Sequence, residues 1–270
     1  MKRLFSFDLD GTLLNNEGSI FIENIEAIEK ASKKGHKIAI ATGRNYIYAQ
    51  LATKQYWGLF DYFVGCNGGI MHSIRERKIY LEEEKISFDF VPSIIEEIKE
   101  VGGTIQISTD KDVFVELYIY EHNLKIISDS VKKNFFDSFK RVKDMDEEDK
   151  KSIIQISVHF EEHNLRKYWN KGNALYGSQY EFTITSKNNI DINLKNINKL
   201  MRIKEIAKIE DVPYENVFVF GDSQNDNQAL EYYNNTYAME NSLPETKKSA
   251  KNIIGNNNSK DISKVILKNI

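Results

Sequence analysis

Short apolar runs alternate with amphipathic stretches at the start of the chain. The apolar runs predict strands at residues 4–9, 37–41 and 62–65, and apolar residues at helical spacing predict helices at 22–34 and 45–57. Strands that alternate with helices in this way are typical of a parallel sheet. Ligands of such sheets bind where the strands end, so we expect a functional site at the carboxyl ends of these strands.

The pattern changes between about residues 79 and 189 and then returns. Strand-like and helix-like segments still alternate in this middle part, but glycine-rich loops no longer follow the strands. From residue 190 the first pattern resumes. The chain is therefore expected to form a discontinuous α/β core with a Rossmann-like parallel sheet, made of residues 1–80 and 190–270, into which residues 81–189 insert an α+β domain.

Both later parts have their own expected elements. In the insertion, we expect strands at 104–108, 113–118, 153–160 and 182–185, helices at 88–101, 123–139 and 161–176, and an exposed charged loop at 144–151. In the returning core, we expect strands at 190–194, 216–220 and 237–239, and helices at 198–209, 225–232 and 262–268.

Composition narrows the class of protein. Charged residues make up 29% of the 270 positions, but the net charge is only -3, whereas nucleic-acid-binding proteins usually carry a clustered basic excess. The single cysteine, Cys66, excludes an intramolecular disulfide. No apolar run approaches the ~20 residues of a membrane-spanning helix. We therefore expect a soluble, cytoplasmic protein that binds neither nucleic acid nor membrane, and its patterns leave the oligomeric state open.

Two carboxylates stand two residues apart where the first apolar run ends, at Asp8 and Asp10. Side chains at this spacing on a strand share a face, so their charges need a cation or a shared proton. A carboxylate can attack a phosphate monoester to form an aspartyl-phosphate, and a second one can transfer the proton. We expect Asp8 to be the nucleophile and Asp10 the general acid/base, although such a pair can also form a simple turn.

A second segment with candidate chemistry follows the second predicted strand, at Thr42, Gly43 and Arg44. A hydroxyl and a backbone amide at a helix N-terminus can bind phosphate, so Thr42 and Gly43 are candidate substrate phosphate-binding residues. Thr42 is equally suited to cap the helix. Arg44 is expected either to hold the substrate or to pair with an acidic neighbour.

A lysine at the start of a helix in the returning core, Lys199, is the candidate cation for the phosphoryl group. A fixed ammonium stabilises the charge that a phosphoryl group carries during transfer. A lysine in this place can also be an ordinary surface residue. The competing choices for the same role are Lys195, Lys204 and Lys208.

The last segment follows the strand at 216–220 and contains Asp222, Asn225 and Asp226. Magnesium prefers oxygen ligands and usually takes one or two carboxylates together with substrate phosphate and water. We expect the metal ligands to be Asp8, the main-chain carbonyl of Asp10, and Asp222, with Asp226 acting through water or by orienting its neighbours. Asn225 is a candidate phosphate-binding residue. The acidic residues are alternatively helix caps favoured by the helix dipole.

Taken together and in this order, the segments resemble the haloacid dehalogenase superfamily, and within it the Cof-like phosphatases with a large α/β cap of type IIB. The resemblance covers essentially the whole chain. It rests on FDLDGTLL at 7–14, ATGR at 41–44, NGG at 67–69, Lys199, and FGDSQND at 220–226. Two departures are Leu200, where relatives generally have glycine, and the absence of a glycine around residues 260 and 261.

The resemblance implies a Mg2+-dependent phosphatase of small phosphorylated metabolites, commonly sugar phosphates and sometimes flavin or pyridoxal phosphates. It also implies that the inserted cap excludes bulk water and selects the substrate. The alternatives are a phosphomutase, which would return the phosphoryl group to the sugar, and a non-catalytic relative that binds a phosphorylated metabolite. A receiver-like signalling module is disfavoured, because the paired Asp8 and Asp10 and the inserted cap favour turnover.

Overall fold

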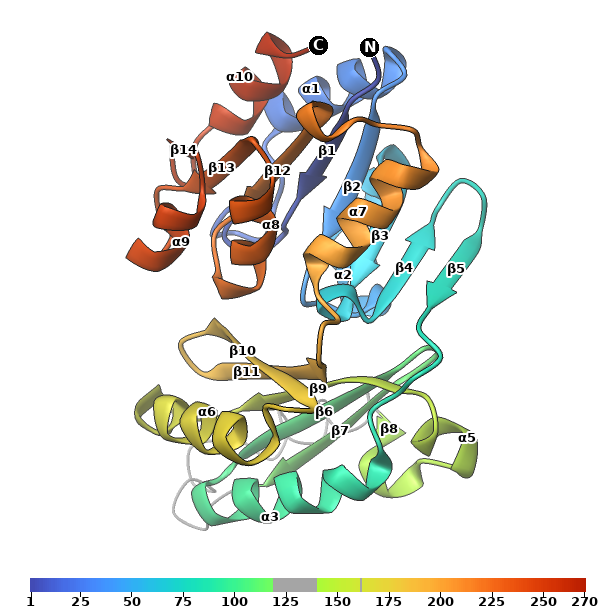
Figure 1. Cartoon of the computed structure of the whole chain (residues 1–270), viewed down its shortest axis with the longest axis vertical. Helices are drawn as coiled ribbons and strands as arrows, with labels where there is room; N and C mark the ends of the chain where they lie inside the picture. The colour runs from blue at the N-terminus through green and yellow to red at the C-terminus, as the bar shows by residue number, and fades with distance from the viewer. Residues whose placement is uncertain (119–139, 161) are drawn as a thin grey trace. The chain divides into compact units, whose positions relative to one another are not determined.

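The computed structural model describes residues 1–118, 140–160 and 162–270. The chain divides into two compact units (Figure 1). The core unit comprises residues 1–80 and 198–270, and the inserted unit comprises residues 81–197. The helix expected at 123–139 lies outside the described residues. Within the described part of the chain, no helix is both long and apolar enough to cross a bilayer.

The core unit contains an eight-stranded sheet in the order β14-β13-β12-β1-β2-β3-β4-β5. Neighbouring strands from β14 to β3 are parallel, and β4 runs antiparallel to β3. The strands are β1 (Leu4–Phe7), β2 (Lys37–Ala41), β3 (Tyr62–Gly65), β4 (Ile70–Ser73), β5 (Lys78–Leu81), β12 (Val217–Gly221), β13 (Asn235–Met239) and β14 (Asn252–Ile254). The expected parallel α/β core is confirmed.

The register of the central strands brings their carboxyl ends to one level. Phe7 of β1 lies opposite Ile40 of β2 and Phe220 of β12, and the rings of Phe7 and Phe220 stack with centroids 4.8 Å apart. The residue after Phe7 is Asp8, so the register places Asp8 beside the ends of the two neighbouring strands.

Helices cover both faces of this sheet, because the central strands are apolar on both sides. Contacts join α1 to α10, and others join α7 to α8 and α8 to α9 (Figure 1). The helices are α1 (Ile22–Lys33), α2 (Tyr46–Thr53), α7 (Lys199–Ile209), α8 (Asn227–Tyr232), α9 (Pro244–Ser249) and α10 (Asp261–Lys268). Two of them begin after an asparagine cap: Asn45 accepts a bond from Tyr48 N, and Asn198 accepts one from Met201 N.

The inserted unit contains a six-stranded sheet in the order β10-β11-β9-β6-β7-β8. Its strands pair antiparallel except β7 with β8. In the part of this unit that the structure describes, the strands are β6 (Gly103–Thr109), β7 (Val113–Tyr118), β8 (Lys140–Arg141), β9 (Ile153–His159), β10 (Tyr180–Ser186) and β11 (Asn189–Leu194), and the helices are α3 (Val91–Val101), α5 (Glu147–Lys150) and α6 (Glu162–Tyr176). Helix α5 lies where an exposed charged loop was expected at 144–151, and Asp146 caps its N-terminus with a capping box.

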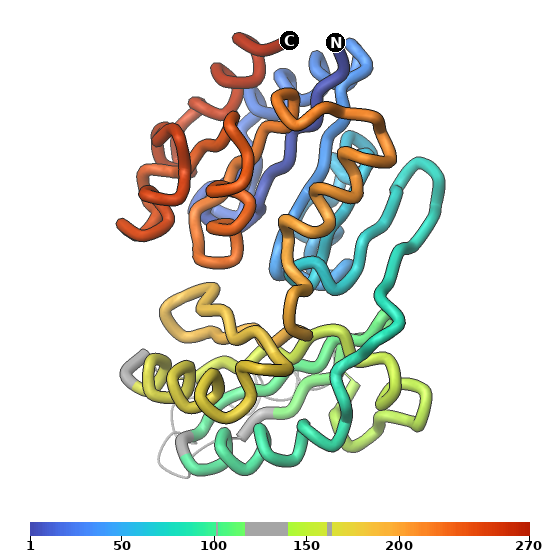
Figure 2. Tube along the Cα trace, in the orientation of Figure 1, coloured from blue at the N-terminus to red at the C-terminus, as the bar shows by residue number. Residues whose placement is uncertain are grey.

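The strand expected at 190–194 was assigned to the wrong sheet. The structure places Asn189–Leu194 between β9 and β10 in the inserted unit, and the chain returns to the core unit only at Asn198 (Figure 2). Buried Ile190 and Ile192 alternate with polar residues along this strand. Such alternation is typical of an antiparallel strand with one apolar face, and not of a parallel strand buried on both faces.

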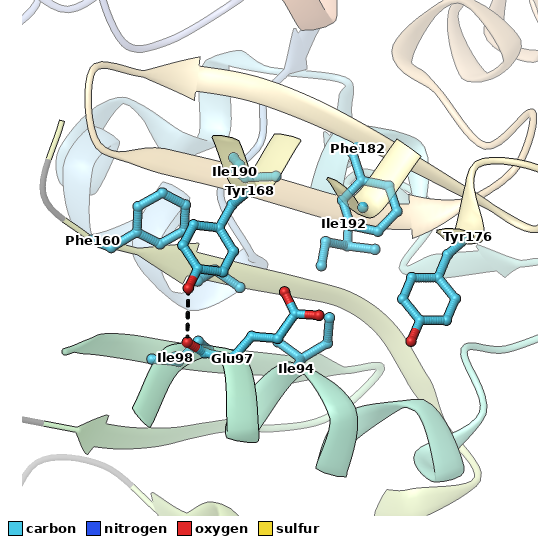
Figure 3. A pocket seen from close by; sticks show the side chains of 11 residues that line it. Ile94, Glu97, Ile98, Phe160, Tyr168, Tyr176, Phe182, Ile190 and Ile192 are labelled. Atoms are coloured by element: carbon cyan, nitrogen blue, oxygen red, sulfur yellow. Dashed lines mark hydrogen bonds between the residues drawn. The ribbon is translucent and has the colours of Figure 1, made fainter. Parts of the chain in front are cut away.

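A small apolar pocket lies inside the inserted unit, between α3, α6 and strands β9 to β11 (Figure 3). Ile94, Ile98 and Phe182 are among the residues that line it. At its edge, the Tyr168 hydroxyl donates a hydrogen bond to the main-chain oxygen of Glu97 at 3.0 Å. None of the predicted site residues lines this pocket, and its apolar walls are unsuited to phosphate.

Candidate functional site

Asp8 follows β1 directly and is almost completely buried. Its amide donates to Phe220 O at 3.0 Å, which continues the bonding of β1 with β12. After Asp8 the chain turns at Gly11, whose φ of +73° is one that glycine adopts at low cost. A Cβ on Gly11 would collide with Oδ2 of Asp222. The glycine therefore lets the turn pack directly against the carboxylate that follows β12.

Three carboxylates gather at this edge of the sheet. Ligand oxygens of Asp8, Asp222 and Asp226 all lie within 4.8 Å of one another. Lys199, only 1% exposed, lies between two of them: its Nζ is 2.7 Å from Asp8 Oδ1 and 2.6 Å from Asp226 Oδ1. One ammonium thus faces three acidic groups in a buried place.

The pKa values reflect this excess of acidic groups. Burial raises the pKa of Asp8 well above its usual range; Lys199 opposes the rise, while Asp226 and Asp222 add to it. Burial, and then the charge of Asp226, raises the pKa of Asp222 to about 7. Burial also disfavours the charge of Lys199, but Asp226 and Asp8 outweigh it and raise the pKa of this ammonium. A further cation would relieve the repulsion among these carboxylates.

The donor set fits a hard divalent cation. Three carboxylates that converge within one site provide the oxygen ligands that Mg2+ prefers. Asp226 is the most constrained of the three: one oxygen bonds Lys199, and the other accepts bonds from the amides of Asp222 at 2.9 Å and Ser223 at 3.1 Å. Asp8 and Asp222 are therefore better placed to bind an ion directly, with Asp226 holding its neighbours in position.

Asp10 lies beside this cluster but is directed to a different partner. Its carboxylate is 56% exposed and forms a two-pronged ion pair with Arg44, with Nε to Oδ2 at 2.7 Å and Nη2 to Oδ1 at 2.6 Å. These bonds to Asp10 are the main reason that the pKa of Arg44 is raised. Of the two roles expected for Arg44, the structure shows the pairing with an acidic neighbour.

Thr42 is buried at the end of β2, and its hydroxyl accepts a bond from Arg44 N at 3.2 Å. It does not cap the following helix, because Asn45 does so. Gly43 lies next to it and is half-buried. These positions keep Thr42 and Gly43 at the edge of the sheet where Asp8 lies.

Asn225 lies in the turn that leads to Asp226. Its Nδ2 donates to Asn67 Oδ1 at 2.8 Å, and its Oδ1 accepts a bond from Ser223 Oγ at 2.7 Å. The structure thus links the turn after β12 to the turn after β3.

The competing lysines lie elsewhere. Lys195 pairs with Glu181 on the surface of the inserted unit, Lys204 lies over the ring of Tyr232, and Lys208 is exposed on α7. Lys199 is the candidate whose ammonium reaches the carboxylates.

Three residues that support the site were not among the residues predicted from the sequence. Thr12 donates its hydroxyl to Asp222 Oδ1 at 3.0 Å, and Ser223 and Asn67 hold the amide of Asn225. Thr12 and Ser223 are hydroxyl residues inside motifs that were already identified, which is a usable signal. Asn67 begins the NGG motif at 67–69, separated by one residue from the end of a buried strand, and an Asn-Gly pair in this place indicates a turn.

Comparisons with known proteins show the family to which the chain belongs. A family model for haloacid dehalogenase-like hydrolases matches residues 5–266. The chain is 25% identical to Phosphatase YwpJ of Bacillus subtilis, over 92% of this chain and 93% of that protein. It is 23% identical to the 5-amino-6-(5-phospho-D-ribitylamino)uracil phosphatase YitU of the same organism, over 97% and 96% of the two chains. Among solved structures, the HAD subclass IIB sugar phosphatase BT4131 aligns with a TM-score of 0.76 at 23% identity, over 98% of both chains.

Proposed function

This chain belongs to the haloacid dehalogenase-like hydrolases, and from that premise we propose that it is a Mg2+-dependent phosphatase of small phosphorylated metabolites. The curated relatives described above are named as phosphatases. The observation that carries the proposal is the buried bridge of Lys199 between Asp8 and Asp226. In this bridge, the proposed nucleophile Asp8 and a buried ammonium lie together at the carboxyl ends of parallel strands.

Asp8, the main-chain carbonyl of Asp10, and Asp222 would hold the Mg2+, with Asp226 supporting them. When bound, the ion would supply positive charge that stabilises the phosphoryl group during transfer. The raised pKa values of Asp8 and Asp222 support this assignment, because burial first, and then the charge of Asp226, disfavours the ionised form of each carboxylate, and a bound cation would offset both effects.

Asp8 is the proposed nucleophile. One of its carboxylate oxygens attacks phosphorus as the bond to the leaving oxygen breaks, which gives an aspartyl-phosphate. Lys199 favours the ionised form of Asp8 and offsets charge on the phosphoryl oxygens. A water oxygen then attacks the same phosphorus, which releases inorganic phosphate and restores Asp8.

Asp10 is the proposed general acid/base. It gives its proton to the leaving oxygen in the first step and takes one from the attacking water in the second, so the protons balance over a cycle. In the structure its carboxylate is held by Arg44. Thr42, Gly43 and Asn225 are the proposed donors to the phosphate oxygens, from a hydroxyl, a backbone amide and a side-chain amide.

The test is Mg2+-dependent phosphate release from an aryl phosphate and from a panel of phosphorylated metabolites. We expect Asp8→Asn to lose at least about 1,000-fold in kcat/KM, since it removes the nucleophile. Asp211→Asn makes the same change at an exposed position of the core unit and should leave the rate unchanged.

Asp10→Asn should lose turnover but still accumulate a phosphoaspartate when the leaving group is good. Equal activity of the wild type and Asp8→Asn, or no activity of the wild type on any substrate, would contradict the proposal. Formation of an isomeric phosphate ester without phosphate release would indicate a mutase instead.

A further inference from the structure

The turn after β3 has an unusual backbone. Cys66, Asn67 and Gly68 have φ values of +50°, +52° and +106° in succession. Left-handed conformations are uncommon for residues other than glycine, although asparagine tolerates them better than most. Such conformations persist only where the surrounding structure enforces them, and they are concentrated at functional sites.

The end of β2 holds this turn by its backbone. Cys66 N donates to Arg44 O at 2.9 Å, and Asn67 N donates to Thr42 O at 3.1 Å. The turn is therefore tied to the segment that carries the proposed phosphate donors Thr42 and Gly43.

Helix α7 holds the turn from the other side. The buried side chain of Arg202 donates from Nε to Gly68 O at 3.0 Å. A Cβ on Gly68 would collide with Asn198 O, the residue that caps α7. The same helix begins with Lys199. The turn at residues 66–68 is therefore fixed both to the segment after β2 and to the start of α7.

These restraints fix the position of the Asn67 side chain. Asn67 is 4% exposed, and its Oδ1 accepts one N–H of the Asn225 amide at 2.8 Å. Ser223 Oγ donates to Asn225 Oδ1 at 2.7 Å, which fixes the other end of that amide. An asparagine side chain has two N–H donors. This arrangement holds the amide in one orientation, and within the described residues its second N–H has no hydrogen-bond partner.

We propose that Asn67 is a positioning residue for phosphate binding: it orients the Asn225 amide so that its second N–H donates to a phosphate oxygen of the substrate. This inference rests on the proposed phosphatase function. A donor that is already oriented loses little rotamer entropy when phosphate binds, so its hydrogen bond adds more to binding and to the transition state.

A double-mutant cycle tests the inference, with kcat/KM for an aryl phosphate and the inhibition constant of inorganic phosphate as readouts. Asn225→Ala should lower kcat/KM by about 100-fold, the loss typical of one oriented donor. Asn67→Gly keeps the left-handed backbone but removes the acceptor, and should lower kcat/KM and weaken phosphate inhibition by about tenfold each. If Asn67 acts through Asn225, the double variant is no worse than Asn225→Ala alone.

The control is Asp211→Gly, which also places glycine at a left-handed position of the core unit and should change neither readout. If Asn67→Gly does not fold, as judged by circular dichroism, Ser223→Ala replaces it in the cycle, because Ser223 holds the same amide. A double variant whose loss is the product of the single losses overturns the inference. So does Asn67→Gly with wild-type kcat/KM.

Calorimetric binding of inorganic phosphate in the presence of Mg2+ separates this inference from the proposed function. If the wild type binds phosphate but turns over no substrate, the proposed function fails. The double-mutant cycle of Asn67 and Asn225 is then evaluated from phosphate affinities alone. If the wild type is an active phosphatase and its phosphate affinity does not change in Asn67→Gly, only the inference fails.

Discussion

Lys199→Met would remove the buried ammonium between Asp8 and Asp226 and keep an unbranched side chain in its place. The ammonium is 1% exposed and lies 2.7 and 2.6 Å from the two carboxylates. Removing one partner of a buried ion pair leaves its neighbours uncompensated and typically costs about 3–5 kcal/mol. We expect the core unit to lose free energy of unfolding in this range when no Mg2+ is present.

The cost of this substitution should also depend on pH. Burial already raises the pKa of Asp8, and the loss of Lys199 raises it further. A group whose pKa is raised by folding binds more protons in the folded state, so the free energy of unfolding rises as pH falls. The rise is larger in the variant, and the gap between wild type and variant should therefore shrink between pH 7.5 and 5.5.

The assay is urea unfolding in EDTA, followed by tryptophan fluorescence. The chain has two tryptophans, Trp57 in the core unit and Trp169 in the inserted unit. In a Trp169→Phe background, Trp57 reports the core unit alone. The control is Lys208→Met, the same substitution at an exposed position of the same helix, which should cost no more than about 1 kcal/mol.

Two results would refute this reasoning about Lys199. The first is a loss of stability in Lys199→Met no larger than in Lys208→Met. The second is a gap to the wild type that stays constant or widens as pH falls. Either would mean that the ammonium does not compensate buried carboxylates in the folded protein.

Three further outcomes are expected. Gly11→Ala should raise the Mg2+ concentration needed for half-maximal activity more than tenfold, because its Cβ would collide with Asp222. Gly18→Ala, at a similar φ of +71° but in open space, should leave that concentration unchanged. Equal Mg2+ titrations of the two variants would contradict this expectation. Arg44→Ala removes the guanidinium that holds the Asp10 carboxylate in position. We expect kcat to fall more with alkyl than with aryl phosphates, because alkyl leaving groups depend more on a proton from the general acid. An equal loss with both would count against Asp10 as the general acid. Burial lowers the pKa of His72 to about 4, so the free energy of unfolding falls as pH drops from 6.5 towards 4. At pH 4.5, His72→Phe should recover about 2 kcal/mol of this free energy, after allowance for the partial exposure of the side chain. Thermal melting curves with the same acid sensitivity in both proteins would refute this expectation.

The parallel core was predictable because its signals are local. Each central strand is a short run of buried apolar residues, and each of β1, β2 and β12 ends in a polar motif. A parallel sheet then brings the strand ends to one edge without any knowledge of side-chain contacts. This is why Asp8, Thr42 and Asp222 were expected at the same edge of the sheet.

The sheet to which β11 belongs was not predicted, because it depends on which other strands β11 pairs with. The strand Asn189–Leu194 looked like the return of the core, but its place is decided by pairing with β9 and β10. The polar residues that alternate along this strand indicate an antiparallel strand with one apolar face. The expectation followed the return of the first pattern at residue 190 and was wrong because it took no account of that alternation.

Contacts between motifs were also hidden in the sequence. Arg44 and Asp10 are 34 residues apart, and Asn67 and Asn225 are 158 apart. Each residue is visible within its own motif, but the pairing depends on the register of neighbouring strands and on turns with left-handed backbones. Sequence patterns indicate which side chains reach an edge of the sheet, and only the folded chain shows which of them bond.

The charge balance of the site depends on several separate segments of the chain. Carboxylates that lie close together repel one another, and in an open loop they could separate into solvent. Here Asp8 and Asp222 directly follow buried strands and Asp226 lies in the turn after β12. Lys199 bonds Asp8 and Asp226, and the amides of Asp222 and Ser223 bond Asp226. The packing of the sheet thus opposes their repulsion, and the remaining excess of acidic charge would favour binding of a divalent cation.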